Sequence, residues 1–302
     1  MTYEEFSSFA DKVHVLSEKT KDALKTVAFH IDKGGTGKTL HSYEFAGFCA
    51  DVLNKRVLVI DGDRSRNLTK TFSVNGELTI REIFKPDGKM PIYHTNNKNI
   101  DIIVGDANFT DEGAEANNWA TKYLEFYYWL SDNYDYLNKM YDIIIIDTHN
   151  DTSRCTFNLL VGTDVVVNVV KPDTNSFGAL QDFVKNINKV VPATKVRNGR
   201  SFSYGYDAKR LVLVTDVTYY GNNPATEVSQ FIDEVEQVDG YIGIVRSNKL
   251  FLKSTLENKG IFELFNELTP AEQASKDKFM SHLQEVYLRI YYEACKKCFE
   301  KI

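Results

Sequence analysis

The sequence predicts an α/β protein in which a mostly parallel, twisted β-sheet carries helices on both faces, preceded by an N-terminal helical extension. Two observations lead to this prediction. Short runs rich in valine and isoleucine alternate along the chain with stretches of helical periodicity, the pattern of strands joined by helical crossovers. Four consecutive isoleucines at 143–146 are typical of a strand buried on both faces, as in a parallel sheet.

Seven β-branched and apolar runs are the predicted strands, at 25–31, 56–61, 100–105, 141–147, 164–170, 210–215 and 241–245. Stretches with helical spacing of apolar residues lie between or after them, at 39–54, 117–139, 153–162, 174–190, 223–236 and 271–300. No repeat or change of composition divides these segments, so residues 25–302 are expected to form one domain. Residues 1–24 are assigned to the helical extension because apolar side chains recur there at helical spacing: Tyr3, Phe6, Phe9, Val13 and Leu16.

The composition excludes several classes of protein. The 302 residues carry 36 Lys and Arg against 42 Asp and Glu, a net charge of −6, so a surface that is basic throughout is excluded and any DNA contact needs a local patch. Four cysteines in a chain of this length do not make a disulfide framework. The chain also shows neither a secretory signal nor a long apolar segment, and we therefore expect a cytoplasmic protein.

Residues 32–39 read Asp-Lys-Gly-Gly-Thr-Gly-Lys-Thr and lie between a predicted buried strand and a predicted helix. The glycines of the segment Gly34-Gly35-Thr36-Gly37 let backbone N–H groups converge on an anion, and the helix N-terminus adds its dipole. Lys38 can then reach the β- and γ-phosphates of ATP, and the Thr39 hydroxyl can ligate Mg²⁺. The alternative is a glycine-rich turn that only joins a strand to a helix.

This segment resembles the deviant phosphate-loop (Walker A) signature K-G-G-x-G-K-T of the ParA/MinD ATPases. The resemblance covers about residues 25–300 and is closest to plasmid-partition ParA proteins of Gram-positive bacteria. It implies a phosphate-loop NTPase fold, ATP and Mg²⁺ as ligands, and hydrolysis of ATP to ADP and phosphate. It also implies that Lys33 reaches across an ATP-dependent homodimer to the partner's nucleotide, so that Lys33 and Lys38 are both catalytic. The alternative for Lys33 is a solvated loop lysine.

Acidic residues end two of the predicted strands, where parallel strands deliver ligand-binding side chains. One strand ends in Asp61-Gly62-Asp63 and another in Asp147. The resemblance implies that Asp61 supports Mg²⁺ and the phosphate loop, that Asp63 orients or deprotonates the attacking water, and that Asp147 holds Mg²⁺ through water. Taken alone, Asp61 and Asp63 are also explained by solvation of a strand end.

Two departures from the family pattern leave the rate of hydrolysis open. Arg64-Ser65 stands where the family usually has Pro-Gln, and His149-Asn150 stands where it usually has Pro-Pro. We assign His149 no role. Asp216 ends a strand near the position of the family's base-binding loop and is expected at the edge of the adenine.

The resemblance further implies an ATP-dependent dimer that binds DNA without sequence preference, associates with the nucleoid rather than a membrane, and is stimulated by a centromere-binding, ParB-like adaptor protein. Two basic segments are candidates for the DNA contact: residues 195–210, and Arg246, Lys249 and Lys253 around a predicted helix at 248–256. Ordinary solvated lysines are the alternative. Two other functions remain open, a MinD-like membrane-associated positioning ATPase and a nucleotide-switched scaffold with little turnover.

Overall fold

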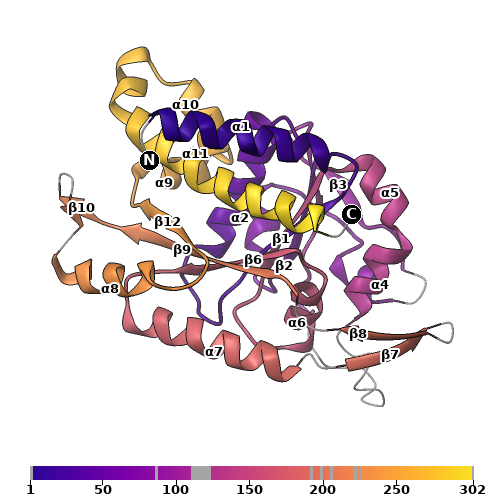
Figure 1. Ribbon diagram of the computed structural model, residues 1–302. Coiled ribbons are helices and arrows are strands. Elements are labelled where there is room, and N and C mark those ends of the chain that lie inside the picture. The colour runs from indigo at the N-terminus through magenta and orange to yellow at the C-terminus, as the bar shows by residue number, and fades with distance from the viewer. Residues whose placement is uncertain are drawn as a thin grey trace.

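The computed structural model describes residues 3–85, 88–109, 124–190, 193–197, 200–204, 207–220, 223–224 and 226–300. Within these ranges, eight strands form one central sheet in the order β12-β9-β6-β1-β5-β2-β4-β3 (Figure 1). Its strands are β1 (Lys25–Phe29), β2 (Val57–Gly62), β3 (Ile92–His94), β4 (Ile100–Ile103), β5 (Ile143–Thr148), β6 (Val165–Val170), β9 (Lys209–Val217) and β12 (Tyr241–Arg246).

The sheet confirms the predicted fold class, because every pairing except one is parallel. All seven predicted strands are present. The exception is the short edge strand β3, which the sequence pattern did not reveal and which pairs antiparallel with β4. The five residues between these two strands are too few for a crossover, so the chain can only turn back on itself.

Helices cover both faces of the sheet, as predicted. They are α1 (Tyr3–Lys19), α2 (Lys38–Gly47), α3 (Asn67–Thr71), α4 (Glu125–Asp132), α5 (Tyr134–Met140), α6 (Arg154–Val161), α7 (Thr174–Val190), α8 (Thr226–Glu236), α9 (Lys249–Glu257), α10 (Ile261–Asn266) and α11 (Pro270–Phe299). A π-helical turn, η1 (Phe48–Val52), continues α2, and a 3₁₀ turn, η2 (Ile80–Phe84), precedes β3.

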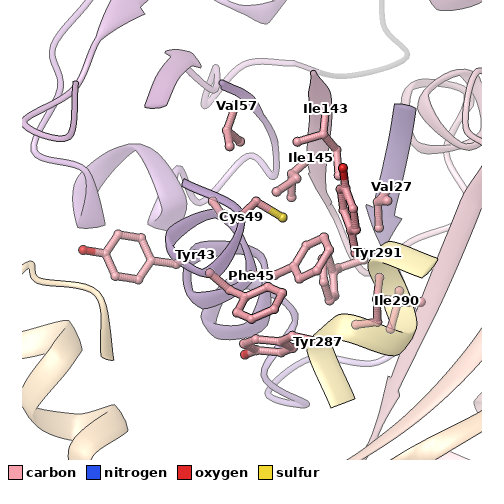
Figure 2. Packing of buried hydrophobic residues seen from close by; sticks show 14 of the residues in the cluster. Val27, Tyr43, Phe45, Cys49, Val57, Ile143, Ile145, Tyr287, Ile290 and Tyr291 are labelled. Carbon is pink, nitrogen blue, oxygen red and sulfur yellow. The ribbon is translucent and has the colours of Figure 1, made fainter. Parts of the chain in front are cut away.

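Among the described residues, the strands and the helices over them form three hydrophobic clusters, and alternate residues of β2 enter two of these. In β2, Val57 and Val59 join the cluster beneath α2 and α11, whereas Leu58 and Ile60 join the cluster beneath α4 and α6. Figure 2 shows the first cluster, in which Tyr287 and Tyr291 of α11 lie among side chains of α2, β1 and β5. A helix on each face therefore buries the strands completely, which explains their continuous apolar runs.

The N-terminal extension forms the predicted helix, and this helix lies along α11 (Figure 1). The ring of Phe9 packs edge-on against Tyr292 with 5.4 Å between centroids. The Ser17 and Tyr291 hydroxyls are hydrogen-bonded at 2.9 Å. Because α11 also forms part of the main core, α1 is fastened to the domain. The division of the chain into residues 1–24 and 25–302 stays a prediction.

Two predicted helical stretches are interrupted. The stretch 117–139 forms α4 and α5, and its first residues lie outside the described ranges. The side chain of Asn133 donates to the Trp129 carbonyl at 2.8 Å, a local bond that competes with a continuous helix at the break. At 223–236 the helix begins only at Thr226, because Asn223–Pro224 (β11) pair with Tyr219–Tyr220 (β10).

The basic segment 195–210 is also partly regular. Ala193–Arg197 (β7) and Arg200–Tyr204 (β8) pair as an antiparallel hairpin that extends away from the sheet (Figure 1). The side chains up to residue 206 lie outside the described residues, so the predicted DNA contact of this segment has no structural test.

Candidate nucleotide-binding site

The loop between β1 and α2 has the backbone shape of an anion cradle. Gly35 and Gly37 have φ values of 73° and 99°, which L side chains rarely adopt. A β-carbon on Gly35 would meet nothing within 4 Å, so backbone conformation alone, and not space, requires glycine there. Gly37 is the N-cap of α2, and the helix therefore directs its first free N–H groups into this loop.

Lys38 is folded over the loop. Only 6% of it is exposed, and its Nζ donates to the Lys33 carbonyl at 3.1 Å. Burial lowers the pKa of the Lys38 ammonium, while the nearby carboxylates of Asp147 and Asp63 oppose this shift. The side chain is thus positioned over the loop with negative charge close by.

Lys33 turns away from Lys38 toward the start of α7. Its ammonium contacts the Asp173 carboxylate and lies 3.2 Å from the Ser176 hydroxyl. Asp173 also accepts the Ser176 backbone N–H at 2.8 Å, so the carboxylate that holds Lys33 also caps the helix. Lys33 and Asp173 are 27% and 39% exposed, so within one chain the lysine forms an accessible ion pair. Sequence reasoning missed Asp173, because nothing local relates two residues 140 positions apart.

Asp61 is fully buried at the end of β2, and both of its carboxylate oxygens are occupied. One oxygen accepts the backbone N–H and hydroxyl of Thr69 at 2.8 and 2.6 Å, and the other accepts the Asp63 N–H at 3.1 Å. Burial raises its pKa to about 6 despite these bonds. The carboxylate therefore fastens the segment from Asp63 to Thr69 to the end of the strand.

Asp63 accepts hydrogen bonds from a serine and contacts a histidine. Its Oδ1 accepts the backbone N–H and the hydroxyl of Ser65 at 2.8 and 2.6 Å, and lies 2.9 Å from Nδ1 of His149. Burial alone would raise the pKa of Asp63, but the bonds from Ser65 and His149 outweigh it and hold the pKa below its usual value. A carboxylate of this kind is suited to orienting a water molecule and is a weak base.

His149 is a residue to which sequence reasoning assigned no role. Asp61 pairs with Asp147 in the register of β2 and β5, so residues two positions beyond each acid meet at the same edge. The sequence contained this signal, because Asp63 and His149 each follow an acidic strand end by two residues. His149 also lies 3.9 Å from the Asp151 carboxylate, which accepts a bond from Arg64 at 3.1 Å. The two segments that depart from the family pattern are therefore linked through the carboxylates of Asp63 and Asp151.

Asp147 has the environment expected of a cation ligand. It is fully buried; one oxygen accepts the Ser42 hydroxyl at 3.3 Å, and the other is buried without a hydrogen-bond partner among the described residues. Burial and the neighbouring Asp61 raise its pKa to about 8, whereas Thr39 and Lys38 lower it. An unpaired carboxylate oxygen beside a threonine hydroxyl fits Mg²⁺. Within the described ranges, no group of three His, Cys, Asp or Glu could enclose a metal, so water and phosphate oxygens would complete its coordination.

Asp216, near the end of β9, is hydrogen-bonded to the residues that follow β6 and β12. Its two oxygens accept Lys171 Nζ at 2.8 Å and the Ser247 hydroxyl at 2.7 Å, and its φ is 59°. The preceding Thr215 is hydrogen-bonded at 2.8 Å to His41 of α2. This places the strand end next to the helix that follows the phosphate loop. The adenine contact of Asp216 stays a prediction, and its carboxylate is engaged with protein groups.

The predicted DNA-contacting residues lie together at the end of β12 and on α9. The Arg246 guanidinium stacks 3.7 Å above the Tyr219 ring, Lys249 is exposed, and Lys253 lies 3.8 Å from Glu257. They form a small basic group, partly balanced by an acid on the same helix. Their role stays a prediction.

The model of the AAA domain family matches residues 24–198, more than half of the chain. The virulence plasmid ParA family protein pGP5-D of Chlamydia psittaci is 28% identical over 162 residues, which are 52% of this chain and 61% of that protein. The chain is a ParA/MinD-type member of the AAA domain family. The match spans less than two thirds of the length of the chlamydial protein. The predicted closeness to Gram-positive ParA proteins stays a prediction.

Solved structures show the same ParA/MinD-type fold. The apo form of McdA from Cyanothece has a TM-score of 0.67 at 16% identity and aligns with 91% of this chain and 99% of its own. A putative plasmid partition protein of Borrelia burgdorferi bound to AMPPNP has a TM-score of 0.62 at 18% identity, covering 92% and 99%. Across the described ranges, none of the helices has the length and apolarity needed to cross a bilayer.

Proposed function

We propose that this chain is a partition ATPase of the ParA type that binds Mg-ATP and hydrolyses it to ADP and phosphate. The observation that carries the proposal is the loop from Gly34 to Thr39. Gly35 and Gly37 have the left-handed φ values of an anion cradle, and Lys38 lies over the loop. Asp63 and Asp147 stand at the ends of neighbouring strands on the same edge of the sheet.

The roles follow from the positions of the side chains. The backbone of residues 34–39 binds the phosphates, and Lys38 contacts the β- and γ-phosphates. Thr39 and Asp147 hold Mg²⁺, which neutralises negative charge on the phosphates. Asp63 orients the attacking water, and Asp61 supports the metal site indirectly by fastening the segment that carries Asp63.

Lys33 acts from a second copy of the chain in this proposal. In one chain it is paired with Asp173, and a partly exposed ion pair of this kind contributes only about 0–1 kcal/mol. A triphosphate in the partner's loop offers Lys33 a stronger electrostatic attraction in a drier site. ATP therefore favours exchange of the internal pair for a contact across a homodimer.

The dimer is proposed to bind DNA without sequence preference, in association with the nucleoid. Arg246, Lys249 and Lys253 supply phosphate contacts, and a centromere-binding, ParB-like adaptor stimulates hydrolysis. Retention on non-specific DNA should be salt-sensitive and should weaken when Lys249 and Lys253 are both replaced by Glu. Unchanged DNA affinity of this double variant would contradict the proposed surface.

Nucleotide binding and subunit pairing test the core of the proposal. Titration of a fluorescent ATP analogue should give saturable binding that Lys38→Ala abolishes and that Lys21→Ala, which removes an exposed lysine from the turn after α1, leaves unchanged. Size-exclusion chromatography should show a dimer with Mg-ATP and a monomer with ADP or without nucleotide. If Lys38→Ala binds ATP normally, the site assignment is wrong.

One observation favours a second function, a nucleotide-switched scaffold with little turnover. Asp63 Oδ1 already accepts a hydrogen bond from the Ser65 hydroxyl and contacts His149 Nδ1. The oxygen proposed to orient the attacking water is therefore occupied by groups of the same chain. Phosphate release measured with ATP and DNA distinguishes the two functions. Multiple turnovers support the ATPase, whereas ATP-dependent dimers without phosphate release support the scaffold.

A further inference from the structure

A cavity of about 630 Å³ lies at the end of α2 that is remote from the phosphate loop. Its walls come from α2 and η1, the end of α3, the turn before β4, and the junction of α9 and α10. Tyr43 of the cavity wall lies five residues, about 7.5 Å along the helix axis, beyond the first residue of α2. Its volume lies within the range of small-ligand sites, and none of the proposed nucleotide residues lines it.

Tyr43 directs an unpaired hydroxyl into this cavity. The residue is only 6% exposed, and its ring packs edge-on against Phe72 at 4.8 Å between centroids. Figure 2 shows the hydroxyl pointing away from the sheet and from the cluster around Phe45. Among the residues that the structure describes, no group is hydrogen-bonded to this hydroxyl, and both Tyr43 and Phe72 line the cavity. The residue as a whole is buried, but it lines the open space of the cavity, where a bound ligand can contact its hydroxyl.

The surroundings of this hydroxyl are negatively charged. Burial, followed by the nearby carboxylates of Glu44, Glu263 and Asp51, raises the pKa of the Tyr43 hydroxyl, so it stays protonated. Of these carboxylates, Asp51 and Glu263 line the cavity, as does a third acid, Glu257. The Asn97 amide fixes Asp51 by donating to it at 2.7 Å.

The basic residues of the wall cancel only part of this charge. The Lys259 ammonium is bound to the carboxylate of Glu267, and Glu257 is likewise paired with Lys253 at 3.8 Å. Among the described residues, Asp51 and Glu263 then face Lys98 as the charged groups of the wall without an ion-pair partner. A negatively charged cavity with two aromatic rings attracts a cation through Coulomb interaction and packs its aliphatic part against the rings.

We propose that this cavity binds a guanidinium or primary ammonium group carried on an aliphatic chain. The cation lies against the Tyr43 oxygen and the carboxylates of Asp51 and Glu263, and the aliphatic chain lies along the rings of Tyr43 and Phe72. Two sources supply this chemistry, a free polyamine and an arginine or lysine side chain of a polypeptide. The inference needs no nucleotide and does not depend on the proposed ATPase activity.

Calorimetric titration of the full chain with two probes tests the proposal. The probes are agmatine and the tripeptide acetyl-Gly-Arg-Gly-amide, with acetyl-Gly-citrulline-Gly-amide as the uncharged isostere. The arginine tripeptide or agmatine should bind saturably, and the citrulline peptide should not. Tighter binding of the tripeptide identifies a chain-borne cation, whereas equal or tighter binding of agmatine identifies a free amine.

Three variants localise the binding. Glu263→Gln and Tyr43→Phe should each weaken it about tenfold, the usual effect of losing a hydrogen bond to a charged group. Tyr43→Phe keeps the ring and its packing, and its circular dichroism spectrum should match that of the wild type. Glu234→Gln, which removes an exposed acid on α8, should have no effect. Absence of saturable binding at millimolar probe, or equal affinity of Glu263→Gln, Tyr43→Phe and the wild type, overturns the proposal.

Discussion

Replacement of Glu44 by glutamine should make the protein more stable at alkaline pH and leave it unchanged at acidic pH. Glu44 lies on α2, and none of its surface is exposed. Its carboxylate accepts the Ser254 hydroxyl of α9 and, at 2.8 Å, the backbone N–H of Ile261 at the start of α10. Within the described ranges it has no ion-pair partner, and burial raises its pKa from 4.5 to about 7.

The sign and size of the effect follow from this shift. Because the folded-state pKa lies above the unfolded value, the folded chain holds the proton more tightly. The resulting stability is fully present below pH 4.5 and is lost as the pH rises through about 7. A shift of about 2.5 pH units corresponds to about 3 kcal/mol. Glutamine can accept from Ile261 and donate to Ser254, so the variant keeps both contacts without a buried charge.

Urea denaturation followed by circular dichroism at several values between pH 5 and 8 measures the difference. The free energy of unfolding of Glu44→Gln minus that of the wild type should rise by about 2–3 kcal/mol over this range. Taking the difference cancels the titration of other buried acids. Glu234→Gln, at an exposed position on α8, is the matched control and should give a constant difference. A constant difference for Glu44→Gln as well would refute a buried, ionisable Glu44.

Three further outcomes are expected. Asp173→Asn removes the charge that holds Lys33, so the ATP-dependent dimer should form at lower protein concentration in analytical ultracentrifugation; an unchanged dimer constant contradicts the competition between the two contacts. Gly37→Ala forces alanine to φ 99° at a cost of about 1–2 kcal/mol, and should weaken binding of an ATP analogue by about tenfold in a fluorescence titration. Phe9→Ala loses the edge-on contact with Tyr292 and should lower the free energy of unfolding by about 1–3 kcal/mol in urea; a change below about 0.5 kcal/mol would mean that α1 is not fastened to the core.

The regular part of the fold was predictable because local patterns encode it. The isoleucines at 143–146 became the buried β5, and the long periodic stretch at 271–300 became α11, which begins at Pro270 after a capping box formed by Thr269 and Glu272. Short elements were missed. The edge strand β3 has three residues and no buried ones, so it carries too little apolar pattern to be recognised.

The candidate site was predictable only in part. The glycines and Lys38 lie in one short segment, so the anion-binding loop could be recognised from local sequence. The parallel pairing of β2 with β5 brings Asp61 and Asp147 into register at one edge of the sheet. The hydrogen-bond partners of these groups were not predicted from the sequence. His149 approaches Asp63 from the residue after β5, 86 residues further along the chain. The bonds from Ser65, together with this contact, lower the pKa of the proposed water-orienting acid.

The sequence by itself determined which segments become strands and helices and that an anion-binding loop joins the first strand to the helix after it. These properties depend on residues that are neighbours along the chain. Only the tertiary structure decided that Asp173 holds Lys33, that Glu44 is buried between three helices, and that the Tyr43 hydroxyl opens into a cavity. Those contacts depend on how the helices pack on the sheet, because burial and Coulomb interactions are set by distances in space, and no periodicity along the chain records them.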